Sequence, residues 1–288
     1  MADSKSQKRS FNSGLILFGL LIIAQCLVFS RALLWYAQRV ENSIEEAFAL
    51  LLSAGIVATH VNYENLKRYR PTTTHLYLIS FAFALYALFH NLGLPSILKS
   101  AIALCSLMYS FAWALKLKLN WGFWSMCLLS LPLVPTLQFF LGYPARLISA
   151  SLTVPLLQMN GYSVIREGVF LNWQGELLQF DAPCSSVIML WAGLYLCSVM
   201  AFIYHFRFIR FGLAMALSCL LILFANIIRA SSLFYLDNLS TTQPQYWQHS
   251  WQHESLGVVS FIGAAGLIIF TLRSLRPSAC DSICIDKS

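Results

Sequence analysis

One cysteine of the chain stands in a polar setting that favours an activated thiol. Cys184 follows Asp181 and Pro183 and leads directly into a long hydrophobic segment. Because Asp181 suits a helix cap and Pro183 suits a first helical turn, we expect Cys184 near the amino end of a helix. The helix dipole there stabilises a thiolate, which is the reactive form of cysteine. The alternative is a small apolar residue at a helix boundary.

Two polar residues, Asn226 and Arg229, interrupt a later hydrophobic segment. They are three residues apart, so a helix places them on one face. A guanidinium in lipid costs ~2.5–3.5 kcal/mol on insertion scales unless it faces protein or water. We therefore predict a polar site that faces a helix bundle. An arginine that snorkels to the lipid headgroups is the alternative.

A histidine precedes the last hydrophobic segment. His253 is followed by Glu254, which would cap the helix or orient the imidazole. Histidine is the usual side chain for proton transfer near neutral pH. His249 is a competing candidate one helical turn earlier, and a passive interfacial histidine is the other alternative. No acidic or thiol ligands accompany the two histidines at a recognised spacing, so we predict no metal site.

The composition indicates which elements must position these residues. Hydrophobic residues make up 58% of the 288 residues and charged residues only 11%, whereas soluble domains average about 25% charged residues. This excludes a soluble enzyme, a disordered chain and a fibrous protein. The net charge of +7 comes from clusters between apolar blocks, which is typical of the loops that orient membrane helices and gives no reason to expect nucleic-acid binding.

We predict an all-α fold: a polytopic transmembrane bundle of about eight helices that forms a single membrane domain over residues 1–288. Each apolar segment is long enough to cross a ~30 Å hydrocarbon layer. The predicted helices are residues 14–36, 44–62, 75–93, 97–115, 121–141, 184–205, 211–233 and 254–272. Residues 1–13 and 273–288 are predicted to be tails on the cytoplasmic side.

The cations predict the orientation, because short loops rich in Lys and Arg stay in the cytoplasm. With the amino terminus inside, thirteen cations lie on the inner side, and the other six lie in outer loops or within helices. The six are Arg31, Arg39, Lys99, Arg146, Arg166 and Arg229. This orientation places Cys184, Arg229 and His253 at the outer ends of three helices. A nucleophile, a cation for an oxyanion and a base are the minimal set for acyl transfer through a thioester.

The outer segment of residues 142–183 is longer than the other loops. It contains four glycines and Pro144, and residues 164–181 mix β-branched and aromatic residues with polar ones in near alternation. The pattern predicts a short hairpin or a re-entrant element on the outer face. A plain connecting loop is the alternative.

At these residues the chain resembles the exosortase/archaeosortase family of membrane cysteine transpeptidases. Three short matches carry the resemblance: APCS at residues 182–185, NIIR at residues 226–229 and HExxG at residues 253–257. They cover only about the last third of the chain. Two positions depart from the family pattern: Ser186 replaces its usual glycine, and Ile188 replaces a frequent arginine.

The resemblance implies a prokaryotic membrane enzyme whose partners are membrane lipids and exported proteins with a carboxy-terminal sorting signal. Such a signal consists of a short motif such as PEP, a transmembrane helix and a basic tail. The resemblance further implies that Cys184 attacks the scissile carbonyl, His253 transfers protons and Arg229 stabilises the oxyanion or thiolate. Ser185, Asn226 and Glu254 would support them, and no diffusible cofactor is needed. The departures indicate a divergent member with its own substrate motif.

Two other classes of function remain open. A transporter or flippase would use Arg229, Asn226 and the outer histidines to bind an anionic solute or lipid headgroup. Transporters often contain paired interrupted helices, whereas here Pro132 and Pro135 interrupt only the helix predicted at residues 121–141. The third class is a non-catalytic subunit of an envelope-polymer assembly.

Overall fold

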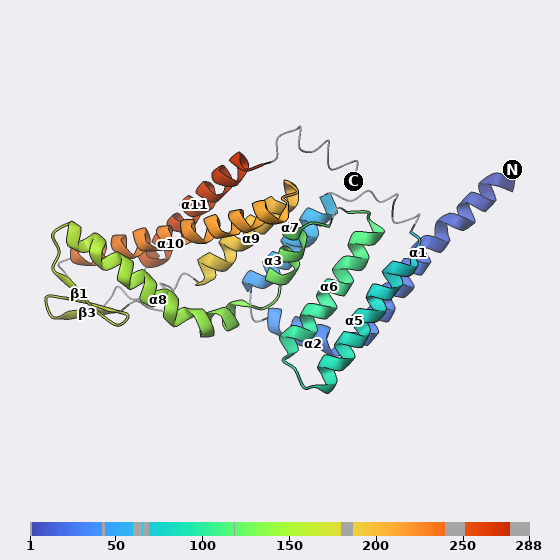
Figure 1. Ribbon diagram of the computed structural model, residues 1–288, viewed down its shortest axis with the longest axis horizontal. Coiled ribbons are helices and arrows are strands. Elements are labelled where there is room, and N and C mark those ends of the chain that lie inside the picture. The colour runs from blue at the N-terminus through green and yellow to red at the C-terminus, as the bar shows by residue number, and fades with distance from the viewer. Residues whose placement is uncertain are drawn as a thin grey trace. The chain divides into compact units, whose positions relative to one another are not determined.

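The computed structural model describes residues 2–41, 44–59, 65, 69–117, 119–179, 187–239 and 251–276. The side chains of residues 2–13, 44–45, 176–179, 237–239 and 251–254 lie outside this description. The described residues are mainly helical (Figure 1). The chain divides into two compact units, Met1–Pro132 and Leu133–Ser288. All of the candidate site residues belong to the second unit.

The first unit consists of helices, and its helix starts follow from local sequence. Thr72 and Asn120 precede α5 and α7, and the side chain of each accepts a hydrogen bond from the backbone N–H three residues later; these bonds satisfy amide groups that a helix start leaves unpaired. α1 and α2 meet at an angle of 78°. The helices that the structure describes in this unit are α1 (Ala2–Val28), α2 (Ser30–Glu41), α3 (Ile44–Thr59), α5 (Thr73–Asn91), α6 (Ser96–Ala114) and α7 (Trp121–Leu129).

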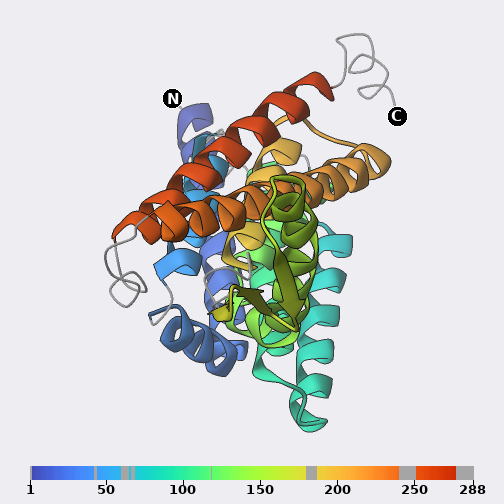
Figure 2. The same cartoon turned by 90° about the vertical axis from the view of Figure 1, so that its left-hand side faces the viewer.

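In its described residues, the second unit combines four helices with a small sheet. The helices are α8 (Val134–Met159), α9 (Val187–Ile203), α10 (Phe208–Leu239) and α11 (Trp251–Ser274). The strands β1 (Val164–Glu167), β2 (Phe170–Trp173) and β3 (Glu176–Gln179) follow α8 and pair antiparallel in the order β1-β2-β3. The sheet lies beside the carboxy-terminal end of α8 in both views (Figure 1, Figure 2).

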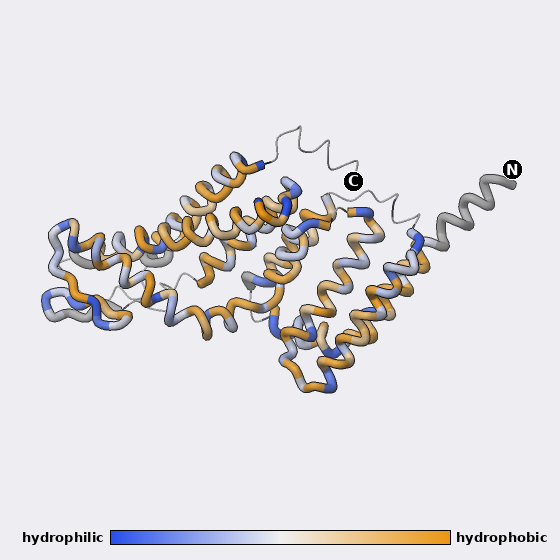
Figure 3. The backbone as a smooth tube through the Cα atoms, in the orientation of Figure 1, coloured by the Kyte–Doolittle hydropathy of each residue, from blue (hydrophilic) through white to orange (hydrophobic). Residues whose placement is uncertain are grey.

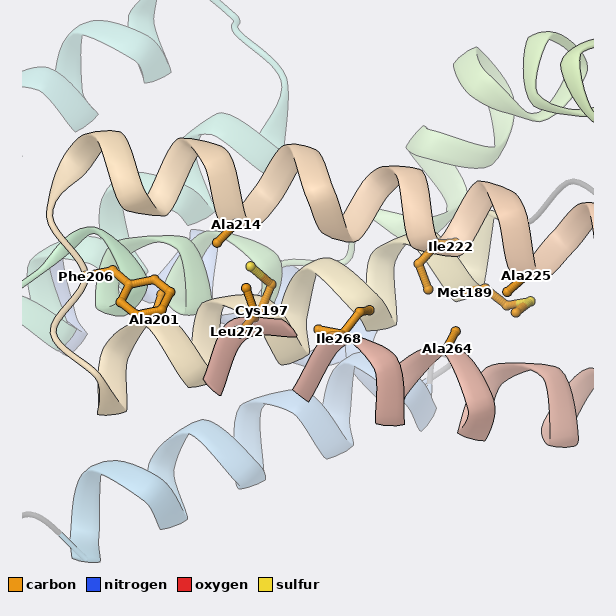
Figure 4. Packing of buried hydrophobic residues seen from close by; sticks show 10 residues of the cluster. All are labelled: Met189, Cys197, Ala201, Phe206, Ala214, Ile222, Ala225, Ala264, Ile268 and Leu272. Atoms are coloured by element: carbon orange, nitrogen blue, oxygen red, sulfur yellow. The ribbon is translucent and has the colours of Figure 1, made fainter. Parts of the chain in front are cut away.

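Helices α9, α10 and α11 enclose the main apolar core of the second unit (Figure 4). A Cβ added to Gly193 of α9 would lie 2.8 Å from the side chain of Ile222 on α10. Glycine therefore allows a close approach of these two helices, as small residues do in membrane bundles. The cluster consists of Met189, Cys197, Ala201, Phe206, Ala214, Ile222, Ala225, Ala264, Ile268 and Leu272.

The contacts fix the directions of these helices relative to α10. Met189 of α9 contacts Arg229 of α10, and Gly193, one turn later in α9, faces Ile222, which is earlier in α10. α9 is therefore antiparallel to α10. Gly257 near the start of α11 also faces Arg229. The amino-terminal parts of α9 and α11 thus lie at the same end of α10.

Tight turns connect the short strands of the sheet. Gln174 and Gly175 between β2 and β3 both have positive φ angles, of +53° and +90°, as the two central residues of a type I′ hairpin turn require. Gly168 has a positive φ in the turn before β2. Val164 and Leu171 are buried against α8 and α10. The hairpin predicted from the alternating pattern is thus confirmed, with a third strand in addition.

The structure confirms the predicted all-α, polytopic helical bundle, to which the small three-stranded sheet is added. Among the described residues, five helices are long and apolar enough to cross a membrane, and the bent pair of α1 and α2 gives a sixth candidate; α3 and α9 are apolar but shorter. Hydrophobic residues cover the helices along their length, and hydrophilic ones gather at the turns (Figure 3). The described residues of each of the eight predicted ranges are mainly helical, and the first range, residues 14–36, contains the bend.

Two predicted boundaries are wrong. The helix predicted at residues 121–141 breaks at residues 130–133, and the segment predicted as a loop from residue 142 is helical up to Met159. Pro132 and Pro135 explain the break, because proline cannot donate within a helix and clashes with the preceding turn. Pro144 and Pro155 lie inside α8; bundle neighbours allow such prolines in membrane helices.

Candidate functional site

Arg229 is buried in the second unit, where α9, α10 and α11 meet. Its side chain is only 6% exposed. The guanidinium Nη1 lies 4.0 Å from the Sδ atom of Met189 in α9 and is the donor of this weak hydrogen bond. The cation therefore faces protein, as its cost in lipid requires. The structure supports the predicted bundle-facing site and contradicts the alternative of an arginine that snorkels to the headgroups.

Gly257 of α11 lies on the other side of the same guanidinium. A Cβ added to Gly257 would be 3.2 Å from Nη2 and 3.3 Å from Cζ of Arg229. These distances are shorter than ordinary van der Waals contact, so the planar group rests against the backbone of α11. Glycine is the residue that leaves room for it. The motif at residues 253–257 thereby acquires a physical reason for its last residue.

Asn226 connects the same part of α10 to α8. Its Nδ2 donates a hydrogen bond of 2.8 Å to Oγ of Ser149, and both side chains are buried. Leu157 and Phe234, eight residues further along the two helices, belong to one apolar cluster. α8 and α10 therefore run in the same direction. Asn226 faces α8, whereas Arg229 faces α9 and α11, so the two neighbouring polar residues of α10 contact different helices.

Thr153 adds a second buried hydroxyl on α8, one turn after Ser149. Its side chain is fully buried, and its Oγ1 has no hydrogen-bond partner among the described residues. A buried hydroxyl without a partner is costly. Ser149 and Thr153 were not predicted as site residues. Their signal in the sequence is a run of small residues at helical spacing, which is also what ordinary bundle packing requires.

The other predicted residues are described only in part or not at all. Cys184 and Ser185, together with Ser186 and the competing His249, lie outside the described residues. His253 and Glu254 belong to α11, where the structure describes the backbone but not their side chains. His253 precedes Gly257 by four residues, which corresponds to the same helix face and about 6 Å along the axis.

In the described part of the site, helices α9, α10 and α11 thus meet at the guanidinium of Arg229. Arg229 contacts α9 at Met189, which is five residues after Cys184 in the sequence, and rests on α11 one turn after His253. A buried guanidinium is a fixed set of N–H donors in surroundings of low dielectric, where its interaction with an anion is strong. It is therefore suited to hold a carboxylate, a thiolate or a developing oxyanion.

One comparison with known proteins agrees with the helical architecture. A family model described as transmembrane exosortase matches residues 35–270. This range includes helices of both units, so the match extends well beyond the three motifs in the last third of the chain. No curated protein and no solved structure matches the chain significantly.

Proposed function

The chain belongs to the transmembrane exosortase family, and on this premise we propose that it is a membrane cysteine transpeptidase that cleaves carboxy-terminal sorting signals of exported proteins. Its thiol nucleophile is Cys184, its proton-transfer group is His253 and its oxyanion-stabilising cation is Arg229. Asn226, Ser185 and Glu254 support these three. We place the reaction on the extracytoplasmic face of a prokaryotic membrane, with both termini in the cytoplasm.

The proposed reaction has two steps. The Cys184 thiolate adds to the scissile carbonyl carbon, and the carbonyl π electrons move to oxygen. When the tetrahedral intermediate collapses, the C–N bond breaks, and His253 donates a proton to the leaving amine. The product is a thioester of the exported protein on Cys184. An acceptor amine or a water molecule then gives a proton to His253, attacks the thioester and releases the thiolate.

The burial of Arg229 between α9 and α11 is the observation that best supports this proposal. The charge of the tetrahedral intermediate develops on the former carbonyl oxygen, so a donor that is already fixed in place stabilises that state most. Such a donor is typically worth about 2.7–4 kcal/mol of transition-state energy. The guanidinium lies against the amino-terminal parts of the two helices that the sequence connects to Cys184 and His253.

The membrane supplies the alignment in this proposal. A sorting-signal helix inserts into the bilayer next to the bundle and holds its cleavage motif at the outer surface. Fixing the depth and direction of the substrate removes much of the entropy cost of a bimolecular reaction. The enzyme therefore needs little further binding energy from a large, water-exposed groove to orient its substrate.

The decisive test is the Cys184→Ala variant expressed with exported proteins of the same genome that end in a motif, a helix and a basic tail. We expect full-length clients to accumulate, and in the wild type we expect a client–enzyme adduct that hydroxylamine cleaves. Continued processing in Cys184→Ala would contradict the proposal. A transporter or an assembly subunit should retain its function in this variant, so the result also separates the classes.

The two histidines provide a matched comparison for the base. We expect His253→Ala to abolish client processing and His249→Ala to retain it, because the proposal gives the proton transfer to His253 alone. Processing rates normalised to the amount of protein in the membrane measure both. The reverse result would assign the role to His249.

A further inference from the structure

The outermost strand of the small sheet has backbone groups that point away from its neighbour. In the order β1-β2-β3, β3 is an edge strand. Glu176 pairs with Trp173 across the two-residue turn, so this pair exchanges both hydrogen bonds. Hydrogen-bonded and non-hydrogen-bonded pairs alternate in an antiparallel ladder. The N–H and C=O groups of Leu177 and Gln179 therefore point outward from β3.

At the opposite edge of the sheet, the outward-pointing backbone groups of Val164, the first residue of β1, already have hydrogen-bond partners. The backbone N–H of Val164 in β1 donates to the carbonyl oxygen of Tyr162 at 3.0 Å, and Nε2 of Gln158 donates to the carbonyl oxygen of Val164 at 2.9 Å. Within the described part of the chain, no strand lies beyond β3. An exposed row of donors and acceptors on a strand is a template for an additional strand.

The sheet is fixed next to the candidate site. The ring of Trp173 in β2 lies 5.6 Å from the ring of Phe234 in α10, and that of Tyr162 lies 5.3 Å from it. Phe234 follows Arg229 by five residues in the same helix. From the end of β3, Cys184 is also only five residues away in the sequence. The outer edge of β3 is therefore coupled to the site through α10 and through the chain itself.

We propose that the outer edge of β3 binds the extended part of the substrate that precedes the scissile bond, as an added parallel strand. This inference rests on the proposed function and specifies how the same site holds its substrate. In this chain an extended strand is followed by Cys184 and then by an apolar helix. A sorting signal has the same order of extended motif, scissile bond and helix, so parallel pairing lets both chains enter the membrane in the same direction.

Recognition by a strand edge has a defined signature. The backbone of the bound peptide supplies the hydrogen bonds, and only every second residue turns its N–H and C=O groups towards the edge strand. Two outward-facing residues on β3 offer two donors and two acceptors. Each intermolecular bond contributes about 0.5–1.5 kcal/mol, so loss of one should raise KM about twofold to thirteenfold without changing kcat.

The first test leaves the protein unchanged. Full-length protein in detergent is given synthetic peptides with the motif and membrane helix of a client that Cys184→Ala cells fail to process. One amide at a time before the scissile bond is replaced by an ester, which removes a single donor. We expect KM to rise about twofold to thirteenfold at alternate residues only. A uniform effect, or none, would overturn the added strand.

The second test compares equivalent prolines on the two edges. Leu177→Pro removes an outward N–H from β3, and Arg166→Pro removes one from the outer edge of β1, where the ladder also directs it outward. We expect a raised KM with unchanged kcat for Leu177→Pro and wild-type kinetics for Arg166→Pro. Equal effects of both prolines, or no effect of Leu177→Pro, would overturn the assignment.

The two proposals fail in different ways. If Cys184→Ala still processes clients, the proposed function fails, whatever the edge variants do. If Cys184→Ala is inactive but the ester scan shows no two-residue period, the proposed function stands and the β3 edge is not the substrate site.

Discussion

The guanidinium of Arg229 is a buried charge in the second unit, and burial of a cation is stable only with suitable contacts. It lies against the Met189 thioether and the backbone of α11 at Gly257. A lysine retains the charge but is a compact ammonium without the planar fork of donors. We expect Arg229→Lys to lose most client processing, by about 10- to 100-fold for a lost hydrogen bond to a charged group.

The control for this prediction is Arg207→Lys, since Arg207 is exposed at the turn before α10. Both variants should reach the membrane in similar amounts, and processing rates are normalised to that amount. Full activity of Arg229→Lys would reduce the residue to a structural anchor.

Gly257 and Gly263 allow a matched test on one helix. A Cβ at Gly257 would lie 3.2 Å from the guanidinium, whereas a Cβ at Gly263 would have no atom within 4 Å. The two substitutions to alanine have the same effect on helix propensity. We expect Gly257→Ala to lower kcat several-fold, because the methyl group displaces Arg229, and Gly263→Ala to be neutral. Equal kcat values in the two variants would show that the contact does not position the cation.

The sequence reveals some of these residues better than others. Arg229 stands out because a charge in the apolar segment between Phe224 and Ala230 is costly in lipid unless it faces protein or water. The contact between Gly257 and Arg229 does not stand out, because it joins α10 to α11 and depends on how the two helices cross. A local pattern carries no information about that crossing.

At the scale of elements, the hydrogen bond from Asn226 to Ser149 joins α10 to α8. Interhelical hydrogen bonds in membrane proteins contribute about 0.6 kcal/mol on average and up to about 1.7 kcal/mol. We expect Ser149→Ala to lower the free energy of unfolding of the detergent-solubilised protein by about 1 kcal/mol. A lower melting temperature measures this loss.

Ser151→Ala is the matched control for Ser149→Ala. Ser151 lies on the exposed side of α8, and among the described residues its hydroxyl bonds to the carbonyl oxygen of Leu147 in its own helix. Its loss should leave the melting temperature unchanged. A drop of the same size in both variants would mean that the bond between the helices contributes nothing of its own.

Hydropathy predicts helices well and their ends poorly. α5 and α6 begin and end within two residues of the predicted ranges, because they are uninterrupted apolar segments of membrane length. The same reasoning fails for α8. Its glycines and prolines are typical of a loop, yet the segment is helical, and Gly142, Ser149 and Ala150 are buried. Small residues are loop formers in water but contact residues between membrane helices, so the correct interpretation depends on neighbours that the local sequence does not show.

At the scale of the whole molecule, the orientation in the membrane stays a prediction from thirteen cations on the inner side against six in outer loops or within helices. It requires Cys184 to be accessible from outside. We expect an impermeant maleimide to label intact cells at Cys184, whereas Cys197, which is fully buried in α9, and Cys219 stay unlabelled.

Cys184→Ser identifies the labelled position, because the signal should disappear in this variant. Labelling that appears only after the cells are opened would reverse the topology. In that case the proposed substrate class would also be wrong, because exported proteins present their sorting signals on the outer side of the membrane.

The bend of 78° between α1 and α2 has a consequence for the surrounding lipid. The apolar part of α1 before the bend, Gly14–Val28, is fifteen residues long, and at 1.5 Å per residue it measures about 22 Å. A hydrocarbon layer of ~30 Å is thicker than this. Such hydrophobic mismatch is relieved when the bilayer thins locally. Vesicles made from short acyl chains should therefore stabilise the first unit more than vesicles made from long ones.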